Sequence, residues 1–313
     1  MSRNMSDILC MGEPMLEFNQ MPPGPDGRVL YLQGHGGDTS NAAIAAARSG
    51  ASVGYITAIG RDAPGESFMA LWQREGVDTT TVRCDPDAPT GIYFVTHGER
   101  GHSFTFYRSG SAASRYRVQD VPEAAIRCAK YLHASGISQA ISASACDAVF
   151  HAMAVAKAAG VRVSYDTNLR LSLWPVARAA AVIHAAIAQA DLAFPSLEDA
   201  RALTGLEDAE AIADFYLRLG CPLVLLKLGA AGVLVATPER RERIPGFSVQ
   251  AVDATGAGDV FAGTFLARSA AGDEPFTAAR YANAAAALST TGYGAVAPIP
   301  RREAVEKLLL TGG

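Results

Sequence analysis

The chain has 313 residues, of which 49% are apolar and 19% are charged, and its formal net charge is −4. A composition this apolar supports a sizeable core and excludes an intrinsically disordered chain. The negative balance argues against a nucleic-acid-binding protein, whose surface usually carries a basic stripe. The length suits one large domain, so we expect residues 1–313 to fold as a single unit.

The cysteines suggest where the protein works. Cys10, Cys84, Cys128, Cys146 and Cys221 are widely spaced and include no C-x-x-C pair. An odd, unpatterned set fits buried thiols in a reducing compartment better than disulfides or a zinc site. The sequence also has no apolar run typical of a signal peptide or a membrane span. We therefore expect a cytoplasmic protein with neither a membrane nor a nucleic-acid partner.

The first third of the chain mixes two kinds of pattern. A short apolar strand at Ile8–Met11, an Ala-rich helix at Ala42–Ser49 and a strand at Val53–Ile59 are predicted for the main body. The segments at about 13–35 and 90–110 instead alternate polar and apolar residues around the turns PPGPDG and GERGH. This alternation is typical of β-ribbons, and we expect the two ribbons to form a small sheet beside the main body.

From about Val121 onward, near-continuous apolar strands alternate with Ala-rich helices. This rhythm predicts an α/β fold in which a mainly parallel sheet is covered by helices on both faces. Such sheets bind ligands beyond the carboxyl ends of their strands. The predicted strands are Tyr131–Ala134, Val161–Tyr165, Leu192–Phe194, Leu223–Lys227 and Val233–Ala236.

The most informative stretch is DATGAGD, residues 253–259, which leads into the apolar helix-forming segment VFAGTFLARSAA. Gly256, Ala257 and Gly258 leave the backbone open, so their amides can point at one anion at the positive end of a helix. Asp259 would stand beside that anion. A carboxylate that takes a proton from a hydroxyl, next to amides that hold a phosphoryl group, is what phosphoryl transfer needs. The same residues also suit an ordinary loop with an acidic helix cap.

Three motifs together give a resemblance. With GGDTSN at residues 36–41, GRDAPGESF at residues 60–68 and DATGAGD late in the chain, the sequence resembles the ribokinase-like (PfkB) carbohydrate kinases over essentially its whole length. A dinucleotide-binding fingerprint is disfavoured, because Phe261 stands where its third glycine should fall and because the stretch comes late in the chain. Within the family, the stretches TGIYF, FYRSGSA, SGISQAIS, DTNLRLSLW and PIPRREA are most similar to 2-keto-3-deoxygluconate kinases.

The resemblance implies a ribokinase-like three-layer sandwich in which the two ribbons form a lid. It also implies an ATP-dependent kinase that phosphorylates a primary hydroxyl, with Asp259 as general base and Gly256, Ala257 and Gly258 as anion hole. The sugar side implied by the matching motifs is Gly36, Gly37, Asp38, Asn41, Tyr93, Phe106, Arg108 and Arg170. Asp38 could equally cap the helix that follows it.

The nucleotide side is implied in the same way. The matching positions are Asn168, Ser196, Lys227, Gly229, Gly232 and Asn283. Asn283 is also open to a simpler interpretation, as a polar residue in an Ala-rich helix. A Mg²⁺ ion is expected with ATP, held mainly by phosphates and water. A monovalent cation such as K⁺ near Asp253 and Thr255, as in some relatives, stays open.

The substrate is the least constrained part of this prediction. A sugar acid such as 2-keto-3-deoxygluconate, converted to its 6-phosphate, would need a partner for its carboxylate, and Arg108 and Arg170 could each grip it through two parallel hydrogen bonds. Related kinases often carry a Tyr where this chain has Phe106. A kinase for a neutral sugar or a nucleoside remains an alternative, and so does a non-catalytic ligand-binding protein of the same fold. Because a ribbon lid exposes strand edges, we expect a homodimer formed through the lids.

Overall fold

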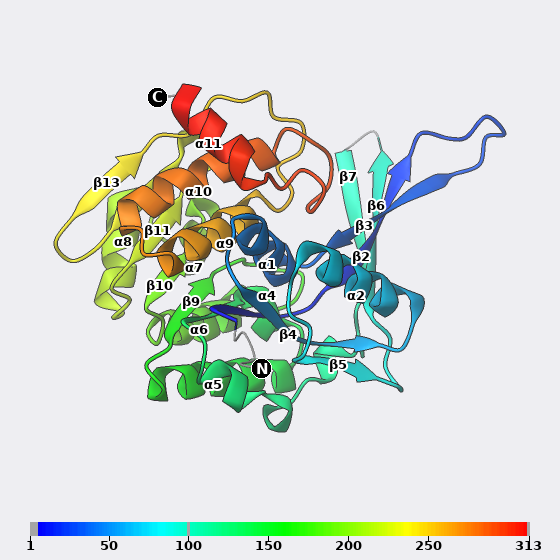
Figure 1. Cartoon of the computed structure of the whole chain (residues 1–313), viewed down its shortest axis with the longest axis horizontal. Helices are drawn as coiled ribbons and strands as arrows, with labels where there is room; N and C mark the ends of the chain where they lie inside the picture. Colours follow the sequence, from blue (N-terminus) through cyan, green and yellow to red (C-terminus); the bar gives the residue numbers. More distant parts are fainter. Residues whose placement is uncertain (1–5, 99–100, 312–313) are drawn as a thin grey trace.

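The computed structural model describes residues 6–98 and 101–311, so Glu99 and Arg100, at the predicted GERGH turn, lie outside the described residues. Within these ranges the strands form a nine-stranded sheet, in the order β13-β12-β11-β10-β9-β8-β1-β4-β5, and a separate four-stranded sheet, in the order β3-β2-β6-β7. Figure 1 shows the small sheet projecting from one side of the larger body.

The large sheet is parallel except at one end. Strands β12 and β13 join it antiparallel, and the other neighbouring strands are parallel. Its strands are β1 (Ile8–Met11), β4 (Val53–Gly60), β5 (Val82–Asp85), β8 (Tyr131–Ser135), β9 (Arg162–Asp166), β10 (Leu192–Phe194), β11 (Val224–Lys227), β12 (Val233–Ala236) and β13 (Arg241–Ile244). The predicted parallel α/β architecture is confirmed.

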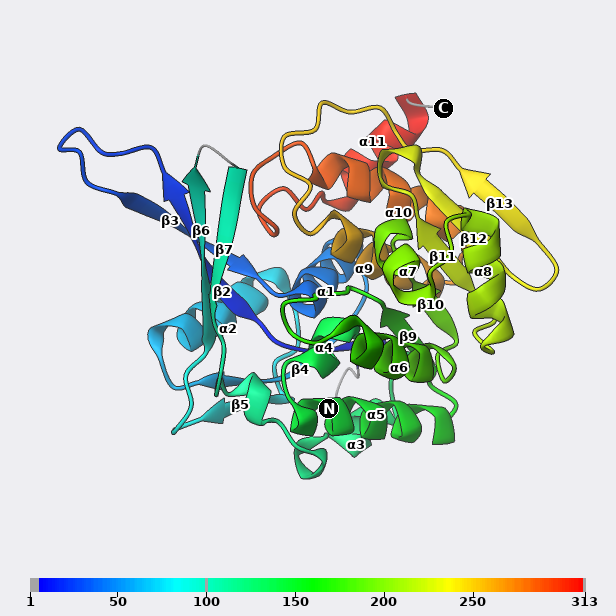
Figure 2. The same ribbon diagram turned by 180° about the vertical axis from the view of Figure 1, so that it is seen from behind.

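Helices cover both faces of this sheet, as Figures 1 and 2 show from opposite sides. One face packs against helices α1 (Asp38–Arg48), α2 (Ala63–Glu75), α9 (Ala257–Ala270), α10 (Pro275–Ser289) and α11 (Arg302–Thr311). The other face packs against α3 (Glu123–Ile126), α5 (Ala143–Ala158), α6 (Val176–Ile187), α7 (Leu197–Thr204) and α8 (Ala209–Arg218), with the short α4 (Gly136–Ala140) after β8. Single 3₁₀ turns occur at Ala113–Arg115, Val118–Asp120 and Gly229–Ala231.

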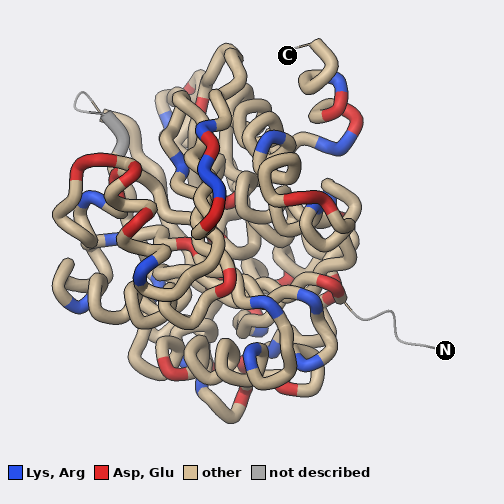
Figure 3. The backbone as a smooth tube through the Cα atoms, turned by 90° about the vertical axis from the view of Figure 1, so that its left-hand side faces the viewer, with Lys and Arg blue, Asp and Glu red and all other residues tan. Residues whose placement is uncertain are grey.

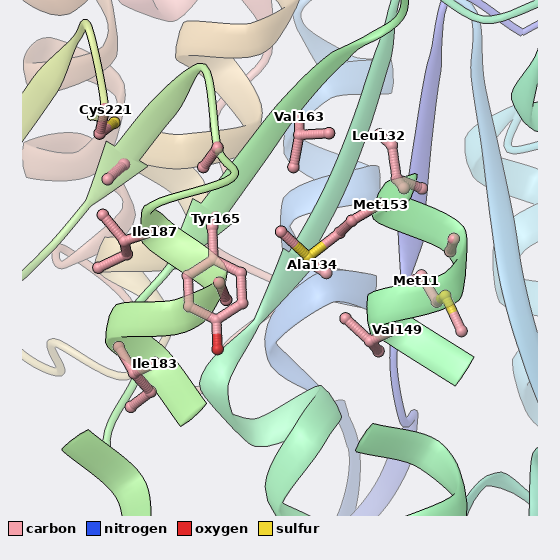
Figure 4. Close-up of a cluster of buried hydrophobic side chains, with 14 of the residues drawn as sticks. Met11, Leu132, Ala134, Val149, Met153, Val163, Tyr165, Ile183, Ile187 and Cys221 are labelled. Carbon is pink, nitrogen blue, oxygen red and sulfur yellow. The ribbon is translucent and has the colours of Figure 1, made fainter. Parts of the chain in front are cut away.

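The two interfaces between sheet and helices form the core. Figure 4 shows part of one of them, where Val163 and Tyr165 of β9 lie among Val149 and Met153 of α5 and Ile183 of α6. Alternate residues of the same apolar strands serve the two faces, because side chains of a strand alternate in direction. The strands that lead to the carboxyl edge of the sheet are therefore packed on both faces.

The four-stranded sheet is built from the two predicted ribbons and is called the lid below. It consists of β2 (Met15–Met21), β3 (Leu30–Gly36), β6 (Gly91–Gly98) and β7 (Gly101–Tyr107). Strands β2 and β6 pair in parallel, and each carries an antiparallel partner at the edge. The lid is anchored to α2 through Ser67, whose hydroxyl is hydrogen-bonded to Gln33 at 3.2 Å and to His35 at 2.9 Å.

Two helix starts and two edge strands differ most from the sequence prediction. Helix α1 starts at Asp38 rather than Ala42, and α9 starts at Ala257 rather than Val260. Edge strands β5 and β13 were not predicted, because their sequences VRCD and RERI lack the continuous apolar run of a central strand. One consequence bears on the site: Asp38 lies inside the first turn of α1 and Gly37 is the N-cap residue, so the capping role considered for Asp38 is wrong.

In the view of Figure 3, acidic and basic residues are interspersed along the backbone. Among the described residues, no helix combines the length and the apolar character that a membrane span needs.

Candidate active site

The turn before α9 has the geometry of an anion site. Gly256 is the N-cap residue and has φ 77°, which a residue with a side chain rarely adopts. The amide of Ala257 donates to the carbonyl of Ala254 at 3.2 Å, whereas within residues 6–98 and 101–311 no backbone carbonyl accepts from the amides of Gly256, Gly258 or Asp259. Three amides at the positive end of a helix are thus open to a negatively charged ligand.

Lys227 adds a cation to this turn. It ends β11, and its ammonium group donates to Asp166 Oδ2 at 2.6 Å. A Cβ on Gly258 would lie 3.1 Å from Lys227 Nζ, so the glycine lets the ammonium approach the turn closely. The donors and the cation together suit the phosphates of a nucleotide.

Asp259 lies in the first turn of α9 and is bound by two side-chain amides. Asn41 Nδ2 donates to Asp259 Oδ2 at 2.9 Å, and Asn168 Nδ2 donates to Asp259 Oδ1 at 3.4 Å. Burial raises the pKa of Asp259 to about 8, and the negative charge of Asp38 adds to the increase. A carboxyl group whose pKa lies near neutrality is well matched to general-base catalysis.

Asp38 is a second buried carboxylate in the same site. Its Oδ2 accepts hydrogen bonds from the hydroxyl of Ser135, at the end of β8, and from Asn168 Nδ2 at 3.3 Å. Burial raises its pKa as well. Asn168 therefore joins Asp38 to Asp259, and among the described residues it is the one non-glycine residue with positive φ, at 30°. Backbone strain of this kind often accompanies a functional constraint.

Two oxygens of the site lack a partner. Asp38 Oδ1 and Asn41 Oδ1 are buried and accept no hydrogen bond from the described residues. Buried polar atoms are nearly always paired, so such acceptors indicate a ligand that donates hydrogen bonds. Sugar hydroxyls are donors of this kind, and both acceptors lie on α1, whose Asn41 binds Asp259.

The lid residues lie on one face of the small sheet. Tyr93 pairs in register with Glu17 and Phe106, so the three side chains share a face. The hydroxyl of Tyr93 donates to the buried Glu17, and a Cβ on Gly36 would lie 2.7 Å from that hydroxyl oxygen. The rings of Tyr93 and Phe106 lie 5.5 Å apart. Because its proton is engaged, Tyr93 can offer a ligand only an acceptor.

The two predicted carboxylate-binding arginines have different surroundings. Arg108 Nε donates to Glu13 Oε2 at 2.8 Å, and Ser111 Oγ donates to Glu13 Oε1 at 2.5 Å. Glu13 is 1% exposed, so the charge of Arg108 is already matched by a buried carboxylate. Arg170 is exposed, and its Nη1 donates to the carbonyl of Leu169 at 2.8 Å.

The predicted nucleotide-side residues divide into two groups. Lys227 and Asn168 lie beside Asp259, as described above. The others contribute visibly to local structure: Ser196 Oγ caps α7 by accepting from the amide of Asp199 at 3.1 Å, Asn283 Nδ2 donates to the carbonyl of Pro245 at 2.7 Å, and a Cβ on Gly232 would meet the carbonyl of Ile244. Gly229 begins a 3₁₀ turn after β11. A nucleotide contact by this second group stays a prediction.

Asp253 and Thr255 lie in the turn before Gly256. Asp253 Oδ1 accepts from the amide of Thr255 at 2.9 Å and from its hydroxyl at 2.6 Å, and Asp253 Oδ2 accepts from the amide of Gly294 at 2.9 Å. Within the described ranges, no group of three or more acidic, His or Cys side chains is arranged to hold a metal ion. A divalent ion would therefore depend mainly on phosphate oxygens.

Three residues of the site were not among the predicted ones: Glu13, Glu17 and Ser135. Glu13 follows β1, Glu17 lies within β2 and Ser135 ends β8, whereas Asp166, which opens the matching stretch DTNLRLSLW, ends β9. Glu13 is bound by Arg108 and Ser111, which lie 95 and 98 residues further along the chain. Such pairing is not encoded in any local pattern.

Fold and site together define a phosphotransferase: a parallel α/β sheet with an anion-binding helix start, a carboxylate beside it and a β-sheet lid. A family model described as pfkB family carbohydrate kinase matches residues 5–302. The chain belongs to this family of carbohydrate kinases.

Individual relatives are named for two different sugar substrates. A 2-dehydro-3-deoxygluconokinase from Thermoproteus tenax is 36% identical, with 97% of this chain and 94% of the relative covered. Fructokinase-1 from Zea mays is 33% identical, with 96% and 97% covered. Among solved structures, a fructokinase from Vibrio cholerae O395 in a form with bound fructose, ADP and calcium ion is similar with a TM-score of 0.86 and 30% identity, covering 98% of this chain and all (100%) of that one.

Proposed function

We propose that the protein uses ATP to phosphorylate a primary hydroxyl of 2-keto-3-deoxygluconate, giving the 6-phosphate. The observation that carries the proposal is that Asp259 adjoins two sets of groups. It follows the open amides of Gly256 and Gly258, which lie close to Lys227, and it is bound by Asn41, which carries an unpartnered acceptor as Asp38 does. This is an arrangement for an anion and a polyhydroxylated molecule that meet at one carboxylate.

The reaction needs little covalent chemistry from the protein. The carboxylate of Asp259 takes the proton from the sugar hydroxyl, whose oxygen forms a bond to the γ-phosphorus while the bond to the leaving ADP oxygen breaks. Amides of the turn and Lys227 stabilise charge on the transferring group. Most of the acceleration in such transfers comes from positioning and charge stabilisation rather than from the base.

Magnesium fits this site as a companion of ATP. The donors around the turn suit phosphate oxygens, and the described residues supply no ready-made ligand cage. The ion would neutralise phosphate charge when bound. A monovalent cation near Asp253 and Thr255 is also part of the proposal, since that turn supports Gly256.

The sugar acid is favoured by the relative from Thermoproteus tenax and by Arg170, an exposed guanidinium close enough to the site to lower the pKa of Asp38, against the larger effect of burial. A guanidinium of this kind can bind a carboxylate bidentately.

One observation favours a second candidate, a fructokinase. Arg108 is already neutralised by the buried Glu13, so this arginine offers no uncompensated positive charge to a carboxylate. The plant relative is named as a fructokinase. A neutral sugar would need only the hydroxyl acceptors of Asp38, Asn41 and Tyr93.

A product panel tests the proposal. The purified protein is incubated with ATP, Mg²⁺ and either 2-keto-3-deoxygluconate, fructose, ribose or a nucleoside, and both ADP release and the phosphorylated product are measured. We expect kcat/KM for the sugar acid to exceed that for fructose by at least roughly tenfold. A preference for fructose would replace the proposed substrate by the second candidate.

A further inference from the structure

A buried ion pair joins the ends of two helices far from the reacting groups. Arg48 is the last residue of α1 and Glu75 the last residue of α2. Arg48 Nε donates to Glu75 Oε2 and Arg48 Nη2 donates to Glu75 Oε1, both at 2.9 Å. The side chains are only 10% and 5% exposed, and these hydrogen bonds lower the pKa of Glu75. The guanidinium is thus held in one orientation as a charged, bidentate pair.

The third nitrogen of the Arg48 guanidinium binds a loop. Its Nη1 donates to the carbonyl of Val296 at 3.1 Å and to the carbonyl of Ile299 at 2.6 Å. Both carbonyls belong to residues 290–301, the glycine loop between α10 and α11, which Figure 1 shows in orange to red on the side of the molecule that carries the lid. Only a guanidinium can donate hydrogen bonds to a carboxylate and to two carbonyls from one plane, so a lysine is not equivalent here.

The other side of the glycine loop contacts the anion-binding turn. The amide of Gly294 donates to Asp253 Oδ2 at 2.9 Å, and Asp253 Oδ1 in turn binds Thr255. A Cβ built on Gly256 would lie 3.2 Å from Ala295 Cβ, so the loop lies directly against the N-cap residue of α9. The loop therefore lies between Arg48 on one side and the turn of Asp253 and Gly256 on the other.

We propose that Arg48, oriented by Glu75, is a positioning residue for phosphoryl transfer. It holds the glycine loop against Asp253 and Gly256, and the loop keeps the amides of Gly256 and Gly258 aimed at one anion. The inference rests on the proposed function, because it assumes that this turn binds the transferring phosphate. Arg48 touches none of the side chains assigned to substrate.

The two ends of α1 give the inference a selective signature. Asp38 and Asn41, assigned to the sugar, lie at the start of the helix, whereas Arg48 ends it. Loosening the loop should misplace the anion-binding amides and leave the sugar acceptors in place. Because small misplacements at a reacting centre are costly, we expect Arg48→Lys to lower kcat by roughly tenfold to 100-fold and to raise KM for ATP. The Kd for the sugar without nucleotide should stay within about twofold.

The matched control is Arg268→Lys. Arg268 Nε donates to Asp273 Oδ2 at 2.7 Å in a partly buried pair at the far end of α9, away from the glycine loop. Its loss should lower stability without changing kcat. Glu75→Gln is the second loop variant. It weakens the anchor of Arg48 and the contact of Glu75 Oε2 with Arg301 Nη2 at 3.5 Å, but it leaves both guanidinium groups, so its effect on kcat should be smaller than that of Arg48→Lys.

The experiment combines turnover with hydrogen exchange. Wild type and the three variants are compared for kcat, for KM of ATP, for sugar Kd by calorimetry and for amide exchange in peptides covering 252–260 and 290–301. We expect faster exchange in both peptides and a lower kcat for Arg48→Lys and Glu75→Gln, and neither change for Arg268→Lys.

Wild-type kcat in both loop variants would overturn the inference, as would a loss of sugar affinity equal to the loss of kcat. Asp259→Asn, assayed in parallel, separates a failure of this inference from a failure of the proposed function. If Asp259→Asn loses turnover while the loop variants keep theirs, the proposed function stands and this inference fails.

Discussion

Asp259 is surrounded by groups with opposing effects on its charge. Burial and the neighbouring Asp38 raise its pKa to about 8, whereas the hydrogen bond from Asn41 and the charge of Lys227 lower it. Burial dominates, so in the free enzyme the carboxyl group holds its proton below that range. Only the deprotonated form can accept the hydroxyl proton.

The pH dependence of kcat/KM follows from the raised pKa of Asp259. The value should increase as pH rises through the region of the raised pKa and level off above it, because kcat/KM reports the free enzyme. Asp38 and Asp259 interact, so the apparent pKa belongs to the pair. The measurement is kcat/KM for the sugar across the range in which the protein stays folded. A profile that is flat down to about pH 5 would mean that Asp259 has an ordinary aspartate pKa.

Substrate charge is tested at Glu13 and Arg170. Arg170→Ala should lower kcat/KM for a sugar acid by roughly 100-fold and that for fructose by less than about threefold, since only the acid loses a charged partner. Glu13→Gln removes the carboxylate that neutralises Arg108. It should therefore shift the ratio of sugar acid to fructose towards the acid. Equal losses on both sugars in Arg170→Ala would remove its role in binding a carboxylate.

At the scale of elements, helices α1 and α9 matter most, because Asp38 and Asn41 lie on one and Asp259 on the other. Their backbones approach closely at Gly263: a Cβ there would lie 2.0 Å from the carbonyl oxygen of Ala42. This approach sets the distance at which Asn41 reaches Asp259. At Gly258, on the same helix, the three atoms nearest to an added Cβ all belong to the end of the Lys227 side chain rather than to backbone.

These two glycines make a matched pair of variants. Both Gly→Ala changes favour a helix by up to about 1 kcal/mol. At Gly263 the clash with backbone should outweigh that gain, so we expect a net loss of about 2 kcal/mol in unfolding free energy. At Gly258 the lysine can move, so the Tm should hold while kcat falls roughly tenfold. Thermal unfolding and turnover of both variants check this, and it is contradicted if Gly263→Ala is as stable as wild type.

Some elements were predictable from the sequence and others were not. The central strands, such as Leu192–Phe194, are continuous apolar runs, and buried parallel strands leave few alternatives. The edge strands Val82–Asp85 and Arg241–Ile244 were missed because one side of an edge strand faces solvent and tolerates polar residues. The start of α1 was placed four residues late because Asp, Thr, Ser and Asn usually precede helices, whereas here the tertiary site requires them inside one.

The same contrast holds for the site. DATGAGD carries its chemistry locally, since glycines, a helix start and an aspartate are adjacent in the chain. Lys227 and Asp166, in contrast, meet across 61 residues, and Arg48 reaches loop carbonyls about 250 residues away. Those partnerships depend on the order of strands in the sheet and on the packing of α1 against α9, which no local pattern contains.

At the scale of the whole molecule, the lid leaves apolar surface exposed. The strand register places several apolar residues on one face of the small sheet: Met21, Leu30, Leu32, Phe104 and Phe106. They are 41–58% exposed, and β3 and β7 are open edges. Exposed apolar patches and open edges both favour association.

We therefore expect a homodimer formed through the lids. Light scattering coupled to gel filtration should give twice the mass of the chain, and Leu32→Asp should give a monomer. The control is Tyr107→Asp, equally exposed but on the opposite face of the lid. A monomeric wild type over a wide concentration range would contradict this expectation.

The measurement that tests the central claim most directly is single-turnover phosphorylation by Asp259→Asn, using whichever sugar the product panel identifies, together with calorimetric binding of that sugar. The amide keeps the size of the side chain but cannot accept the hydroxyl proton as a carboxylate does. The account predicts that the rate of transfer falls by roughly 1,000-fold or more while the sugar still binds within severalfold of wild type. A variant that transfers phosphate at close to the wild-type rate would contradict it.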